Sequence, residues 1–107
     1  MNSPIDYDAQ SDSLYVTISG KRAYITAEIS PRIGVDLTQD GQVVGVGILD
    51  ASTVISDLFG RKVSKINIKH LLCSIKQDDA VYLNFELENQ RASLALPKAY
   101  QSPVLNL

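Results

Sequence analysis

Apolar and polar residues alternate along the first half of the chain with the period of two that is typical of β-strands. Four segments show this pattern, and their inward-facing residues are Leu14, Val16 and Ile18; Ala23, Ile25, Ala27 and Ile29; Ile33, Val35 and Leu37; and Val44, Val46 and Ile48. Between the last two segments, Asp40 and Gly41 form a strong hairpin signal, because glycine accepts a positive φ without steric strain. The pattern predicts a four-stranded antiparallel meander.

Helical spacing replaces the alternation after the meander. Asp50 or Ser52 is expected to cap a first helix, because either side chain can accept a hydrogen bond from a free amide of the first turn. The apolar stripe of this helix is Val54, Ile55, Leu58 and Phe59, and Gly60 ends it. A second helix is predicted from the i, i+3, i+4, i+7 spacing of Ile68, Leu71, Leu72 and Ile75. Its start is open, since residues 66–68 fit a strand equally well.

Alternation returns after residue 79 and predicts a C-terminal hairpin in the same sheet. Its inward residues are Val81, Leu83, Phe85 and Leu87, followed by Ala92, Leu94 and Leu96. We therefore expect an α+β fold with one antiparallel sheet of about six strands and the helices on one of its faces. Residues 1–107 are long enough to form a single domain around one core.

The segment from Tyr7 to Ser52 resembles the small bacterial family known as domain of unknown function 2283. Tyr7 and Asp8, the turn at Ser11 and Asp12, the strand at 13–16, the 40–41 turn and the closing VVGVGILDAS carry the resemblance. The family often has an acid where this chain has Gly47. Its members are often encoded beside small toxins of the ribonuclease kind. The resemblance therefore implies an antitoxin-like or immunity-like role.

Charge is unevenly distributed along the chain, whose net charge is -2. Residues 1–57 hold eight acidic and three basic side chains, whereas residues 58–77 hold five basic and no acidic ones. Such asymmetry bears on partners and association rates rather than on the fold. The lone Cys73 follows Leu71 and Leu72, which indicates a buried apolar side chain. No stretch has the apolar length of a membrane span, and a cytoplasmic location is expected.

Residue sets for catalysis are not apparent. His70 is the only histidine, so the chain has neither a Ser-His-Asp arrangement nor a histidine pair for a metal. Asp6, Asp8 and Asp12 lack the glycine and terminal glutamate of a calcium loop. Asp8 and Asp12 are instead expected to hold the turn before a strand. The sequence therefore predicts no enzyme, no cofactor and no metal site.

We predict a protein-binding module that neutralises a cognate toxin, with the ribonuclease class taken from the family resemblance. An acidic meander suits the basic cleft of a nuclease. The predicted partner-binding residues are Asp6, Asp8, Asp12, Asp36 and Asp40, with Tyr15 and Tyr24 as aromatic anchors. Two alternatives stay open. One is a self-associating structural module or homodimer, and the other is weak nucleic-acid binding through residues 61–69, without sequence specificity.

Overall fold

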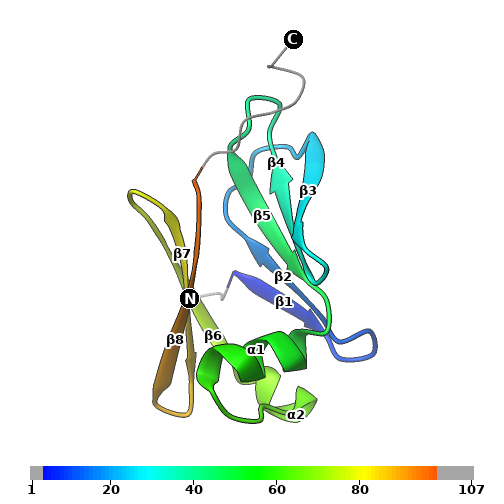
Figure 1. Ribbon diagram of the computed structural model, residues 1–107, viewed down its shortest axis with the longest axis vertical. Coiled ribbons are helices and arrows are strands. Elements are labelled where there is room, and N and C mark those ends of the chain that lie inside the picture. The colour runs from blue at the N-terminus through cyan, green and yellow to red at the C-terminus, as the bar shows by residue number, and fades with distance from the viewer. Residues whose placement is uncertain (1–3, 99–107) are drawn as a thin grey trace.

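The strands form two antiparallel sheets instead of the single sheet that the sequence predicted (Figure 1). The computed structural model describes residues 4–98. Five strands form one sheet in the order β1-β2-β5-β4-β3, and three form the other in the order β6-β7-β8. The elements are β1 (Ile5–Asp8), β2 (Ser13–Thr17), β3 (Ile25–Ser30), β4 (Ile33–Leu37), β5 (Val43–Ile48), α1 (Ala51–Phe59), α2 (Lys65–Ile68), β6 (Leu72–Gln77), β7 (Val81–Leu87) and β8 (Gln90–Leu96). The predicted α+β class is confirmed.

The five-stranded sheet is only partly a meander. Strands β3, β4 and β5 are consecutive neighbours, but β2 pairs with the other side of β5 rather than with β3. This register aligns Val16, Val46 and Val35 across three strands, and all three side chains are fully buried. Strand β1, which the sequence did not predict, pairs with β2 and extends the sheet by one strand.

The predicted hairpin of β7 and β8 is present, but it belongs to the second sheet, where β6 completes it. The inward residues of β7 are all buried, as their alternation predicts. They form one core cluster with the buried residues of the five-stranded sheet and of both helices. The three-stranded sheet therefore covers the inner face together with the helices, which lie at one end of the molecule (Figure 1).

The second predicted helix is wrong over most of its length. Its first turn, α2, starts with a capping box in which Ser64 and Asn67 satisfy each other's backbone amides. From Leu72 the chain is strand β6, where Cys73 is buried and Leu72 is exposed. The apolar residues here fit both periods, and pairing with β7 selects the strand.

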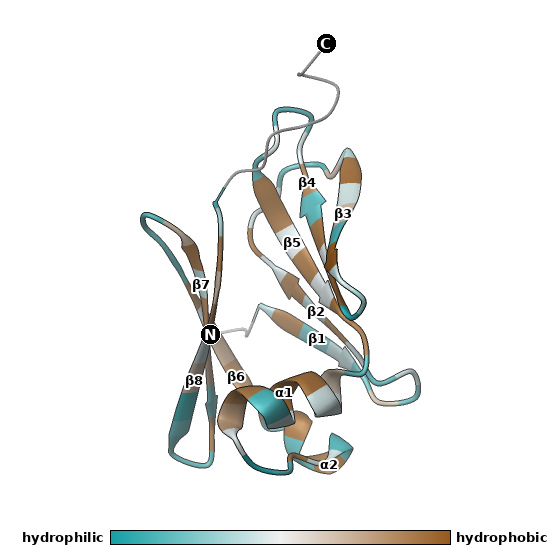
Figure 2. Ribbon diagram, in the orientation of Figure 1, coloured by the Kyte–Doolittle hydropathy of each residue, from teal (hydrophilic) through white to brown (hydrophobic). Residues whose placement is uncertain are grey.

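Hydrophobic and less hydrophobic residues alternate along the strands of the larger sheet (Figure 2). In β5, valine and isoleucine alternate with Gly45 and Gly47. The glycines lie on the outer face, opposite the side that packs into the core. Strand β5 itself therefore carries no side chain on the outer face at residues 45 and 47.

Candidate partner-binding site

The predicted partner-binding residues lie on separate parts of the five-stranded sheet. Asp8 and Asp12 flank the turn between β1 and β2, whereas Asp40 lies in the β4–β5 turn at the opposite end (Figure 1). Asp36 and Tyr15 lie between these ends on the outer face. Tyr24 immediately precedes β3 and is 56% exposed. The acidic segment therefore does not form one continuous binding surface.

Asp12 is a structural residue that joins the sheet to helix α1. Its Oδ1 accepts hydrogen bonds from the Tyr7 hydroxyl at 2.6 Å and from the Ser52 amide at 3.1 Å, and its Oδ2 accepts from Ser52 Oγ at 2.6 Å. Asp50, the N-cap residue, is in the left-handed region and makes no side-chain capping bond. The expectation that Asp50 or Ser52 caps α1 is therefore wrong. The cap comes from Asp12, 40 residues before Ser52.

The electrostatics of this site follow from its hydrogen bonds. Burial alone would raise the pKa of Asp12, but the bonds from Ser52 and Tyr7 outweigh it and lower the pKa below the ordinary 3.8. Burial, together with the bond to Asp12, raises the pKa of the Tyr7 phenol above its ordinary value. Asp12 is thus held as a carboxylate at the N-terminus of α1, where the helix dipole favours a negative charge.

Tyr15 and Asp36 form a second pair, on the outer face. The Tyr15 hydroxyl donates to Asp36 Oδ2 at 2.6 Å, and Thr26 Oγ1 donates to Asp36 Oδ1 at 2.6 Å. The network thus links β2, β4 and β3. Burial and the bond to Asp36 raise the pKa of Tyr15 to about 12. Both oxygens of Asp36 accept hydrogen bonds within the sheet, and its side chain is less exposed than those of Asp6 and Asp8, which makes it a poorer contact for a partner.

Gly45 makes this second pair possible. To reach Asp36 from β2, the Tyr15 side chain must cross β5, and it does so directly above Gly45. A Cβ at Gly45 would lie 1.9 Å from the Tyr15 hydroxyl, which is far inside contact distance. Gly47 is different, because a Cβ there would meet Tyr15 at 3.8 Å, an ordinary van der Waals distance. Only Gly45 is therefore required by the network.

The candidate site is a hollow of about 250 Å³ on the outer face of β1, β2 and β5. Its lining includes the exposed carboxylates Asp6 and Asp8, the ring of Tyr15, the bare backbone of Gly47 and the side chain of Leu49. Asp8 accepts two bonds from its own turn, from Gln10 N and Ser11 Oγ, both at 3.0 Å. We name these five lining residues the acidic hollow. They bring together Asp6, Asp8 and Tyr15 but not the other predicted residues.

Leu49 is the member of the acidic hollow that sequence reasoning did not assign to a partner. Its side chain is 57% exposed, although it directly follows the buried Ile48. The signal was its place in the alternation, since Leu49 shares the outer face with Gly45 and Gly47.

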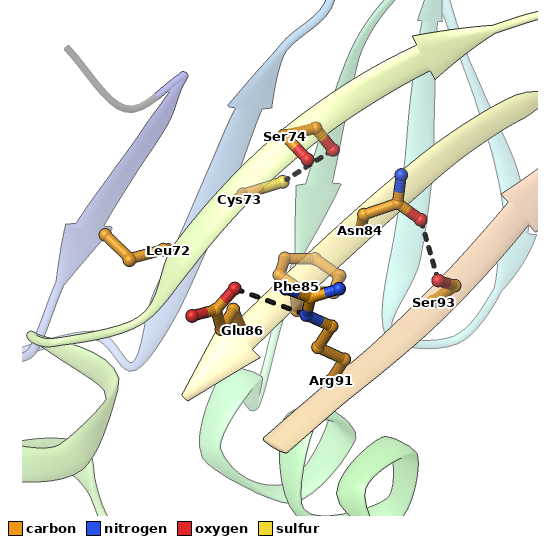
Figure 3. Close-up of a pocket in the computed structure, with 8 residues that line it drawn as sticks. All are labelled: Leu72, Cys73, Ser74, Asn84, Phe85, Glu86, Arg91 and Ser93. Carbon is orange, nitrogen blue, oxygen red and sulfur yellow. Dashed lines mark hydrogen bonds and ion pairs between the residues drawn. The ribbon is translucent and has the colours of Figure 1, made fainter. Parts of the chain in front are cut away.

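A second hollow, of about 530 Å³, lies on the outer face of the three-stranded sheet (Figure 3). Its polar side chains bond to one another. Ser93 Oγ donates to Asn84 Oδ1 at 2.7 Å, and Arg91 Nε lies 3.5 Å from Glu86 Oε1. Cys73 borders the hollow, but its side chain belongs to the core, and burial raises its pKa to about 11, which keeps it protonated at neutral pH. These groups do not converge on a common point.

The remaining sequence predictions concern metals, membranes and nucleic acid. Within residues 4–98, no group of three or more His, Cys, Asp or Glu side chains could hold a metal ion. None of the helices in the same range combines the length and apolarity needed to cross a membrane. In the basic segment 61–69, Arg61 forms an ion pair with Glu88 at 3.0 Å and also bonds to Gln90. Its guanidinium is thus partly used within the fold.

The fold and its outer face define a small α+β protein with an acidic, glycine-lined surface on one of its two sheets. Residues 5–52 match the model of a family described as Protein of unknown function (DUF2283). This confirms the resemblance for the segment that contains β1 to β5 and the first residues of α1. No curated protein matches the chain, and no solved structure matches it.

Proposed function

We propose that this protein is a non-enzymatic binding module whose acidic hollow receives a cationic side chain of a basic partner protein. The observation that carries the proposal is the pairing of two exposed carboxylates, Asp6 and Asp8, with an apolar floor. A lysine or arginine side chain would use both features, because its aliphatic stem packs on apolar groups while its charged end binds carboxylates.

Gly47 contributes to this proposal in two ways. Its bare backbone leaves the floor open, so that a long side chain can approach the sheet closely. It is also the position where the DUF2283 family often has an acid, and a Cβ there fits beside Tyr15 without strain. The family's acid would then lie in the same hollow and serve the same cationic group.

The class of partner follows from the family resemblance. We propose a cognate ribonuclease-type toxin, encoded beside this chain and neutralised by it in the cytoplasm. A ribonuclease holds its phosphate-bearing substrate with basic side chains, and an acidic surface that occupies them excludes the substrate. The acidic hollow supplies such a surface at Asp6 and Asp8.

The test is inhibition of RNA cleavage by the small nuclease encoded next to the chain. The wild-type chain should abolish cleavage near equimolar ratio and restore growth when the two proteins are co-expressed. Asp6→Asn with Asp8→Asn should weaken inhibition by about 10-fold or more, because close interfacial charge pairs couple by about 1.5 kcal/mol or more.

The matched control is Asp78→Asn with Asp79→Asn, which removes the same charge from the turn between β6 and β7 on the other sheet. This variant should inhibit as the wild type does. Equal losses in both variants would mean that net charge matters rather than the acidic hollow. No inhibition by the wild-type chain would reject the toxin as its partner.

A further inference from the structure

Strand β3 is one of the two edges of the five-stranded sheet, and its isoleucine side chains are partly exposed. Its one hydrogen-bonded neighbour is β4. Tyr24 is 56% exposed, and Ile25 and Ile29 are each 40% exposed. In Figure 1, β3 lies on the side of the sheet away from the three-stranded sheet. An exposed apolar edge strand is a template for pairing with another strand.

We propose that β3 pairs with β3 of a second copy of this chain, antiparallel and centred on Ala27. Two copies related by a two-fold axis present the same strand to each other, so the sequence of β3 must complement its own reverse. Around Ala27 it does so. Ile25 of one copy meets Ile29 of the other, and Thr26 meets Glu28. Pairing in this way would join the two five-stranded sheets into one continuous sheet.

Other registers are less favourable. A shift by one residue places core-side residues opposite outer-side ones, which a continuous sheet does not allow. A shift by two residues toward the C-terminus places the two Glu28 side chains directly opposite each other, and like charges at that position are destabilising. A shift by two in the other direction leaves Ile29 without a partner. Of these registers, only the one centred on Ala27 pairs isoleucine with isoleucine at two positions and keeps the glutamates apart.

The strength of the dimer follows from its size. A single pair of short strands buries less than the roughly 1,200 Å² of a stable interface, so we expect a weak dimer with a dissociation constant on the order of 100 μM. The bulge between Glu28 and Ser30 limits regular pairing at the C-terminal end of β3. The proposal does not depend on the acidic hollow, which lies on β1, β2 and β5.

Sedimentation equilibrium from roughly 10 μM to 1 mM tests the proposal, because the range spans the expected dissociation constant. The mass should rise from the 11.7 kDa of the chain toward twice that value. In the variant Ile25→Lys with Ile29→Lys, a lysine at position 25 of each copy faces a lysine at position 29 of the other. The dissociation constant of the dimer should therefore rise by at least about 30-fold. Ile25→Lys combined with Ile29→Glu places opposite charges together twice and should recover at least about 10-fold of that loss.

Two features make the experiment decisive. Both variants replace the same two exposed isoleucines, so their unfolding free energies should be similar, and the difference between them reports the register. Amide exchange adds a second readout, since protection of residues 25–29 should increase with concentration. A chain that stays at 11.7 kDa throughout, or a dimer that tolerates both lysines, would overturn the proposal.

Discussion

Two tyrosine–aspartate pairs hold the larger sheet, and they differ in their surroundings. Both have an oxygen–oxygen distance of 2.6 Å. The pair of Tyr7 and Asp12 is partly buried beside α1, where Asp12 also binds Ser52 through both oxygens. The pair of Tyr15 and Asp36 lies on the open face above Gly45. The same type of hydrogen bond thus helps to join the sheet to α1 in one place and links β2 to β4 on the outer face in the other.

This difference explains which acids are available to a partner. Asp12 and Asp36 are both occupied by hydroxyl donors within the fold, although their residue type made them candidates for binding. Asp6 and Asp8 are exposed beside the hollow. Sequence alone does not distinguish the two kinds of aspartate, because their hydrogen-bond donors come from distant parts of the chain.

The largest expected effect is at the buried pair. Asp12→Asn should lower the free energy of unfolding by about 2 kcal/mol, since it removes the charge that accepts three hydrogen bonds and faces the N-terminus of α1. Asparagine tolerates the positive φ of this position, so backbone strain does not confuse the result. Urea denaturation measures the change. Asp8→Asn, in the same turn, is the control and should change stability by less than about 0.5 kcal/mol.

A smaller effect is expected at the exposed pair. Gly45→Ala should displace the Tyr15 ring, break its bond to Asp36 and cost about 1 kcal/mol. The pKa of Tyr15 should then fall from about 12 toward 10.0, which NMR titration of its ring resonances would detect. Gly47→Ala is the matched control and should leave both properties nearly unchanged. A normal Tyr15 titration in Gly45→Ala would show that the ring does not need the glycine.

The smallest expected effects are on the pH dependence of the unfolding free energy. Asp12 contributes to it at acidic pH and Tyr15 at alkaline pH. Because the folded pKa of Asp12 lies below 3.8, its contribution is present above pH 3.8 and is lost as the pH falls through the folded value. Because the folded pKa of Tyr15 is about 12, its contribution is complete below pH 10.0 and is lost between there and pH 12. In urea denaturation across pH, Asp12→Asn should lose the acid-side dependence of stability, whereas Tyr15→Phe should keep it and lose the part of the alkaline dependence that Tyr15 contributes.

Local periodicity predicted the elements that are periodic over their full length. The inward faces of β4 and β7 were predicted correctly, because each buries alternate residues against the core. In β5, Val46 and Ile48 lie in the core as predicted, but a register shift at Leu37 places Val43 there instead of Val44. Strand β1 was missed because its two apolar residues, Ile5 and Tyr7, are too few to establish a period. Strand β6 was predicted as a helix because Leu71 and Ile75, four residues apart, fit both periods, and the exposed Leu72 fits only the helical one. Partition into two sheets depends on long-range pairing, which periodicity does not encode.

The candidate site was predicted in part. Asp6, Asp8 and Tyr15 converge on one hollow, and the glycines of β5 lie on the open face beside them. The roles of Asp12 and Asp36 were not predicted, because hydrogen bonds over 40 and 21 residues leave no local signal. Ile25 and Ile29 were expected to face the core, and they are exposed because the covering sheet does not reach β3.

The central claim is that the exposed acids of the hollow, rather than those bound within the fold, attract a basic partner. Its most direct test is the association rate constant with the nuclease that we propose as partner, measured by stopped flow from roughly 20 to 200 mM ionic strength, a range over which screening of exposed charges becomes strong. The wild-type rate should fall as salt rises, and Asp6→Asn with Asp8→Asn should slow it by about 3- to 10-fold at low salt while the unfolding free energy stays unchanged. A salt-independent rate, or a rate that the two substitutions leave at the wild-type value, would contradict the claim.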